Sequence, residues 1–123
     1  MGIRLSSGVI ALLLGAGAVS PLGAATPAEL DALAQATARP ASGIALARRQ
    51  MAGGNMLDAL ATLERVIINS PQSDEARLLH AALLCRLDDR RGADVEFDTL
   101  RGRQIPDKLW AEADAACIQG KGS

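Results

Sequence analysis

The sequence is poor in aromatic and β-branched residues: its 123 residues include one Trp, one Phe and no Tyr. Strands favour such residues, so their scarcity gives little support for a β-sheet. The apolar content, 49% of the chain, comes mainly from Ala and Leu, which are strong helix formers. We therefore expect an all-α chain, and its length allows one domain at most.

Residue sets that support catalysis or metal binding are also missing. His80 is the only histidine, and we expect it to be a packed structural residue rather than a general base. There is no Ser-containing elbow, no Gly-rich phosphate loop and no histidine-plus-carboxylate set. The spacing of Cys85 and Cys117 matches no zinc or redox motif. These absences predict a non-enzymatic protein without a cofactor or a bound metal.

The first 25 residues have the features of a cleaved secretory signal. Arg4 and the α-amino group supply a positive start, residues 8–19 form an apolar run of twelve, and residues 20–25 end in small side chains. Twelve apolar residues are fewer than the roughly 20 that a membrane-spanning helix needs. We expect cleavage after Ala25, with Ala24 as the alternative, and a periplasmic or secreted mature chain with no stable membrane span.

The mature chain would have no excess of basic residues. Loss of Arg4 leaves 13 − 1 = 12 basic residues against 14 acidic ones, a net charge of 12 − 14 = −2. Nucleic acids and anionic membranes call for a basic excess, so neither is expected as a partner. In an oxidising compartment, two cysteines most simply form one disulfide, here between Cys85 and Cys117.

Apolar residues three and four positions apart predict a series of helices. Residues 26–29, Thr-Pro-Ala-Glu, have the form of a capping box and begin an N-terminal helix within 26–39. Ser42 is expected to cap the next helix, which Gly53 and Gly54 end. Further helices are expected near 55–69, 74–87, 90–100 and 107–117, followed by a disordered tail over 118–123.

The helix lengths repeat. Pro71 and Pro106 are 35 residues apart, and each follows a pair of helices joined by a tight polar turn. The two turns are Gly53-Gly54-Asn55 and Asp88-Asp89. Such a period indicates a helical repeat array.

Residues 40–117 resemble the tetratricopeptide repeat family. In the first unit the matching positions are Leu46, Ala47, Gly54, Ala59, Leu63, Val66 and Pro71. In the second they are His80, Ala81, Leu84, Asp88, Asp89, Ala93, Phe97 and Leu100, with Pro106 one residue late. The resemblance implies an α-solenoid of antiparallel helix hairpins, with about two and a half repeats. It also implies that small residues lie where paired helices approach most closely: Ala47, Ala59, Ala81 and Ala93.

The chain departs from the family at two positions. Gly43 and Arg77 stand where an aromatic residue is usual, and the third unit has room for only one helix. A related array of helix hairpins and an unrelated helical bundle therefore remain as alternatives. On the repeat alignment, the disulfide would pin the last helix to its neighbour and stabilise a small core by roughly 3 to 4 kcal/mol.

The resemblance implies a non-catalytic interaction module, which binds a peptide or partner protein on a concave surface lined by the first helix of each unit. This surface would be an apolar strip with basic edges, suited to a segment that carries carboxylates. Its residues would be Ile44, Arg48, Met51, Leu78, Ala82 and Arg86. The family's peptide-carboxylate clamp is absent, because Arg48 and Ala82 replace the required asparagine and lysine.

A structural or assembly subunit is the alternative function. An array that ends on a lone helix leaves one face of that helix to cover, and the last helix here carries the only tryptophan, Trp110. Such a subunit would self-associate through its terminal helix or cap a larger envelope complex. This alternative implies a homo-oligomer.

Overall fold

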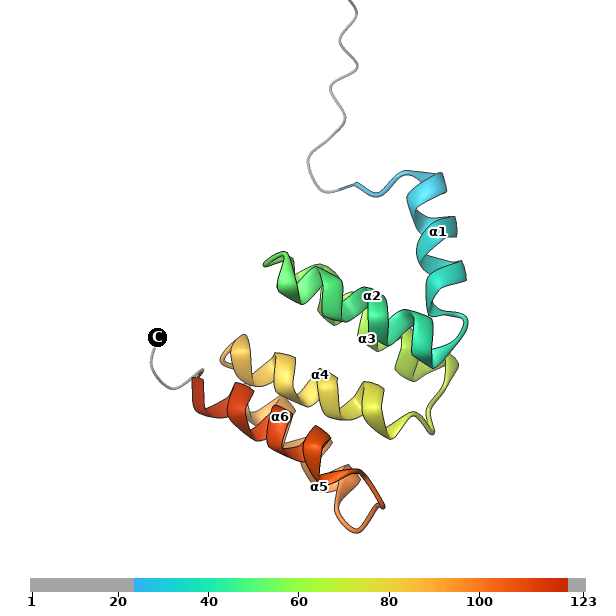
Figure 1. Ribbon diagram of the computed structural model, residues 1–123. Helices are drawn as coiled ribbons and strands as arrows, with labels where there is room; N and C mark the ends of the chain where they lie inside the picture. Colours follow the sequence, from blue (N-terminus) through green and yellow to red (C-terminus); the bar gives the residue numbers. More distant parts are fainter. Residues whose placement is uncertain (1–23, 120–123) are drawn as a thin grey trace, which may run out of the picture.

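The computed structural model describes residues 24–119, and this range contains six α-helices and no strand (Figure 1). The prediction of an all-α chain is therefore confirmed. The expected signal lies outside the described residues except for Ala24 and Ala25, and so do residues 120–123 of the expected tail. The helices are α1 (Pro27–Thr37), α2 (Pro40–Ala52), α3 (Met56–Asn69), α4 (Asp74–Arg86), α5 (Arg90–Leu100) and α6 (Asp107–Gln119).

The predicted capping box is confirmed at the start of α1. The backbone N–H of Glu29 donates to Thr26 Oγ1 at 3.2 Å, and the backbone N–H of Thr26 donates to Glu29 Oε2 at 2.7 Å. The backbone hydrogen bond from Thr26 lowers the pKa of Glu29 below its ordinary value of 4.5, because the bond favours the ionised carboxylate.

Two predicted helix ends are wrong. Ser42 does not cap α2, because the helix already begins at Pro40, where a proline needs no partner for an N–H and has a helical φ. The Ser42 hydroxyl instead donates to the carbonyl oxygen of Ala36 at 2.6 Å. At the other end of the chain, Ile118 and Gln119 belong to α6 and not to a tail, since the first glycine after Cys117 is residue 120.

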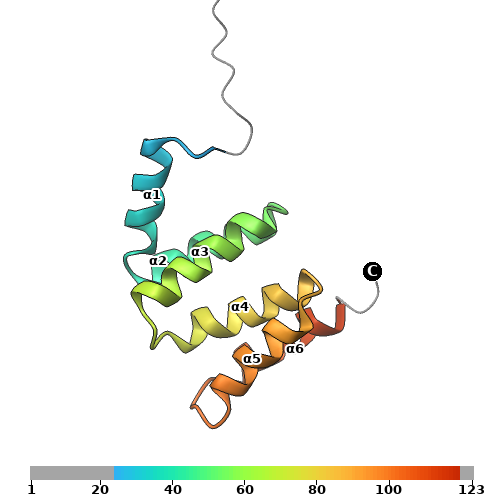
Figure 2. The ribbon, with the colours of Figure 1, turned by 180° about the vertical axis from the view of Figure 1, so that it is seen from behind.

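The helices form two layers. Helices α2, α4 and α6 face the viewer in Figure 1, and α3 and α5 lie behind them, as the reverse view in Figure 2 shows. Helix α2 pairs with α3, and α4 packs against α3, α5 and α6. Eight residues of α4 are buried, the most of any helix, so α4 is the centre of the array. This packing fits a repeat-like array of helix hairpins.

The hydrophobic core consists of two clusters on either side of α4. The first joins α2, α3 and α4, and the second joins α4, α5 and α6. Buried members of the first are Ile44, Ala47, Ala59, Leu63, Val66, Ala76, Leu79 and Leu83. Buried members of the second are Leu78, Ala82, Leu100 and Ala113, with Phe97, Leu109 and Trp110 partly buried beside them.

The small residues predicted to lie where paired helices approach most closely are buried. The four alanines at 47, 59, 81 and 93 are all buried. Gly43 explains one departure from the repeat pattern, because a Cβ atom there would lie only 2.2 Å from Val66 Cγ2 on α3. An aromatic side chain could not occupy that position without separating α2 from α3.

Candidate functional site

The predicted disulfide is confirmed. Cys85 Sγ and Cys117 Sγ are bonded at 2.02 Å and join α4 to α6, the two helices that the repeat alignment places side by side. Cys85 is buried and Cys117 is partly exposed. The bond fixes the last helix at the edge of the layer formed by α2, α4 and α6.

This layer carries two adjoining open hollows, which together we name the α2–α4–α6 groove. Their volumes are about 410 Å³ and 260 Å³, and both are lined by Met51, Arg86 and Glu112. The other lining residues are Arg48 and Ala52 in the first hollow, and Leu79, Ala82, Ala115, Ala116 and Gln119 in the second. Three helices therefore contribute to one surface.

Four of the six residues predicted to bind a partner line this groove: Arg48, Met51, Ala82 and Arg86. Ile44 does not, since it is 6% exposed and packs in the core with α3 and α4. Leu78 does not either, since it is 2% exposed and packs in the second cluster with residues of α5 and α6. Ala82 lines the second hollow although it is equally buried, at 2%. Helical spacing correctly groups residues on one side of a helix, but it does not show which neighbouring helix covers each turn.

Arg48 is already paired within the protein. Its guanidinium donates two hydrogen bonds to the Glu112 carboxylate on α6 and one, at 3.4 Å, to Glu75 Oε1 on α4. Hydrogen bonding to Glu112 is the main cause that raises the pKa of Arg48 above its ordinary value. Arg48 therefore connects α2 to α4 and α6, and its charge is balanced before any partner arrives.

Sequence analysis missed Glu112, and the repeat register gives no signal for it. Ala47 and Ala81 are 34 residues apart, and the same step leads from Ile44 to Leu78 and on to Glu112. Because Ile44 and Leu78 are buried, extending the repeat register into the last helix would predict a core residue at position 112 and not a carboxylate of the groove. The Glu112 carboxylate also changes the charge of the surface, which was expected to have basic edges alone.

Among the described residues, Arg86 is the cation of the groove without an ion-pair partner. It is exposed at the C-terminal end of α4 and makes no ion pair with any residue in the range 24–119. Met51, Ala82 and Ala116 lie beside it in the groove. The arrangement offers one unpaired positive charge next to an apolar floor.

His80 lies away from this groove, in a polar cluster between α4 and α5. It is 9% exposed, and its Nδ1 atom is 3.3 Å from Glu96 Oε1. Arg77, the second departure from the repeat pattern, pairs with the same Glu96 at 3.0 Å. The cluster links the two helices of a hairpin through charges, and a packed structural role for His80 fits this position.

The described residues contain no group of three or more His, Cys, Asp or Glu side chains placed to hold a metal ion. Among the helices between residues 24 and 119, none combines the length and the apolar content needed to cross a membrane. Comparison of the chain with family models, with curated proteins and with solved structures finds no match.

Proposed function

We propose that this protein is a non-catalytic, exported interaction module of the tetratricopeptide-like kind, which binds a peptide segment of a partner protein in the α2–α4–α6 groove. The observation that carries the proposal is the groove itself, which brings Met51 on α2, Arg86 on α4 and Glu112 on α6 to one open surface. Grooves between helices are a recurring means of binding an apolar segment.

The chemistry of the groove defines the segment that it suits. The floor is formed mainly by Ala115 and Ala116 of α6, with the 2% exposed Ala82 beside them, so small or flat apolar side chains can approach it closely. Arg86 favours a carboxylate at one end of the segment, because it has no partner among the described residues. Arg48 supports the groove instead of binding the partner, since Glu75 and Glu112 already engage it.

The disulfide supports an exported location for this module. Structural disulfides persist in oxidising compartments and are rare in the cytosol. The Cys85–Cys117 bond stabilises α6, one of the three helices that line the groove. Reduction of this bond would loosen α6, which forms one side of the groove. We therefore expect binding to need the oxidising conditions of an exported protein.

The test begins with a pull-down from envelope extract, followed by titration of the captured partner's binding segment as a synthetic peptide. Arg86→Glu should weaken binding by about tenfold or more, because a like-charge contact at an interface costs several kcal/mol. The matched control is Arg91→Glu, which reverses an exposed arginine near the start of α5, outside the groove. Equal weakening by both variants would contradict the groove assignment.

Reversal at Arg48 is unsuitable for this test. Arg48→Glu would place a third carboxylate beside Glu75 and Glu112, and their repulsion would disturb the packing of α2 against α6. A loss of binding would then have two causes. Arg86, which lies in no such network within the described residues, isolates the effect of charge on binding.

Sedimentation of the purified protein tests the alternative of a self-associating subunit. The apolar residues of α6 largely face the core, where Leu109 and Trp110 pack against the second cluster. Ile118, 71% exposed, is the one large hydrophobic residue among the exposed ones of α6. A stable dimer that Ile118→Ser dissociates would favour assembly through the terminal helix over the interaction module.

A further inference from the structure

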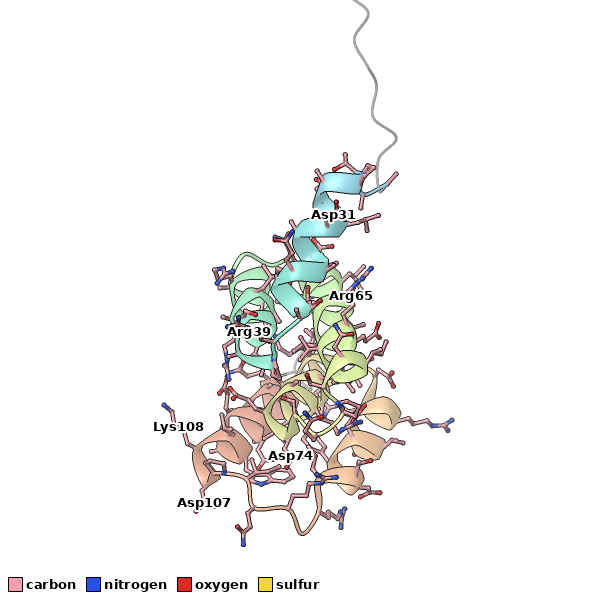
Figure 3. The ribbon with its side chains drawn as sticks, turned by 90° about the vertical axis from the view of Figure 1, so that its right-hand side faces the viewer. Asp31, Arg39, Arg65, Asp74, Asp107 and Lys108 are labelled. Carbon is pink, nitrogen blue, oxygen red and sulfur yellow. A yellow bond between two sulfur atoms is a disulfide. The ribbon has the colours of Figure 1, made fainter. Side chains whose placement is uncertain are left out.

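Apart from the α2–α4–α6 groove, another open hollow lies at the opposite end of the array, between α1 and the α2–α3 hairpin. Helix α1 meets the body near its C-terminal end and stands away from it along the rest of its length (Figures 1 and 3). The hollow, which we name the α1 hollow, has a volume of about 640 Å³. Its lining residues are Ala24, Ala25, Glu29, Leu30, Ala32, Leu33, Ala36, Leu46, Gln50, Asp58, Ala61 and Thr62.

The lining of the α1 hollow is apolar and carries charge of one sign. Most of its residues are alanines and leucines, and Leu30 is 44% exposed. Of the lining residues within 24–119, only Glu29 and Asp58 are charged, and both are acidic. Cleavage after Ala25 would remove Ala24 and Ala25 from the lining and make the Thr26 nitrogen a cationic amine, which already donates to Glu29 Oε2 at 2.7 Å and would balance that carboxylate. Asp58, which makes no ion pair within residues 24–119, then supplies the net charge of the hollow. The hollow therefore favours an apolar occupant with a cationic edge.

The neutral polar groups of the lining favour a helical occupant. Thr62 Oγ1 donates to Gln50 Oε1 at 2.8 Å, so these two side chains largely satisfy one another. An extended peptide would bring backbone N–H and C=O groups against alanine and leucine side chains, where they lack partners. A helix satisfies its own backbone and can place one apolar face in a groove.

A second copy of α1 is a poor occupant on grounds of charge. Helix α1 contains Glu29 and Asp31 but no Lys, Arg or His. Packing it into the α1 hollow of another copy would bring these carboxylates toward Asp58. Because like charges at an interface oppose binding, the charge pattern favours a different chain.

From these observations we infer that the α1 hollow is a docking site for a basic amphipathic helix of a second partner protein, separate from the α2–α4–α6 groove. The two sites require opposite charges: Arg86 favours an acidic segment in the groove, and Asp58 favours a basic one in the hollow. The inference does not depend on the proposed function of the groove, because no residue of the described part of the chain lines both sites.

The test measures binding of a synthetic probe to the purified protein by fluorescence anisotropy. The probe is a helical peptide of about 18 residues, or five turns, with Leu and Ala on one face and Lys at the edges of that face. A matched probe carries Glu in place of each Lys. The Lys probe should bind at least about tenfold more tightly than the Glu probe.

Two charge reversals distinguish binding in the hollow from attraction by the net charge of the protein. Asp58→Lys should weaken binding of the Lys probe by about tenfold or more, whereas Asp31→Lys should weaken it less than about threefold. Both residues lie in the first half of a helix, and Asp31, labelled on α1 in Figure 3, is not one of the lining residues. Equal weakening by both reversals would show attraction by net charge alone and would overturn the inference.

Leu30→Ser keeps the charge and tests the apolar contact, and it carries the test if Asp58→Lys prevents folding. It should weaken binding of the Lys probe by several fold, because the exposed part of Leu30 would be covered by the occupant. Unchanged binding would contradict docking in the hollow. A stable homodimer of the unmodified protein that Leu30→Ser dissociates would identify a second copy as the occupant and would also overturn the inference.

Discussion

The two ends of the array are held in different ways. Helix α6 is bonded to α4 through Cys85–Cys117, is joined to α2 through Arg48–Glu112, and packs Trp110 and Leu109 against the core. Helix α1 buries only one residue, Thr37, near its C-terminal end. The comparison shows that a terminal helix is fixed by bonds reaching it from other helices, since its own sequence supplies helicity but not position.

Breaking the disulfide should leave α6 less firmly held, as α1 already is. We expect this change to cause the largest loss of stability. In the chain-entropy model, a bond between residues 32 positions apart stabilises the folded state by about 3 to 4 kcal/mol. Urea denaturation of the protein, oxidised and reduced with dithiothreitol, measures this loss, and hydrogen exchange should show the fastest new exchange in α6. The same unfolding midpoint in both states would refute the expectation.

A substitution that pushes α2 and α3 apart should destabilise the end of the array that carries α1. Gly43→Ala places a Cβ atom 2.2 Å from Val66 Cγ2, and overpacking of this kind costs about 1 to 3 kcal/mol of unfolding free energy. Thr37 of α1 also contacts this site, since its Cα atom would lie 3.4 Å from the new Cβ. Thermal denaturation measures the cost.

Two further variants show whether that cost comes from the contact. Gly53→Ala adds a methyl group where the nearest atom would be 3.4 Å away, so it should change stability little. Val66→Ala removes the clashing Cγ2 atom, so the double variant Gly43→Ala with Val66→Ala should lose less stability than the sum of the two single variants. If the losses of the two single variants simply add, the loss of stability in Gly43→Ala does not come from the contact with Val66 Cγ2.

The contrast between the two ends also shows what the sequence could predict. The hairpins were predictable because their signals are local: Gly53-Gly54 and Asp88-Asp89 mark the turns, and apolar spacing marks the helices between them. The Arg48–Glu112 pair was not, because 64 positions separate its members. The burial of Ile44 and Leu78 was missed for a related reason, since the helices that cover them are separate elements of the chain.

Removing the charge of Glu112 should loosen α6 slightly. Glu112→Gln weakens the pair with Arg48, and both side chains are partly exposed, at 44% and 37%. Exposed ion pairs contribute about 0.2 to 1 kcal/mol, and salt reduces the contribution. The difference in unfolding free energy between the variant and the unmodified protein should therefore shrink as salt is added. A loss that does not depend on salt would mean that packing, and not charge, holds this contact.

Acid should affect the α1 end in a small and local way. The pKa of Glu29 is lowered in the folded state, so its capping interaction contributes stability above the ordinary pKa of 4.5 and loses it as pH falls through the lower, folded value. Amide signals of α1 measured by NMR during acid titration should show fraying in that window. Glu29→Gln can still accept the capping bond but does not titrate, so fraying of α1 with the same pH dependence in this variant would exclude Glu29 as its cause.

The disulfide also has a topological consequence, because Cys85 and Cys117 close a covalent ring that contains the whole of α5 and the loop before α6. Arg101 and Arg103 are exposed in that loop, where trypsin can reach the backbone. A single cut there would leave α6 covalently attached to α4. The nicked protein should therefore migrate as one species on a non-reducing gel and separate into two fragments only when the sulfur–sulfur bond is reduced.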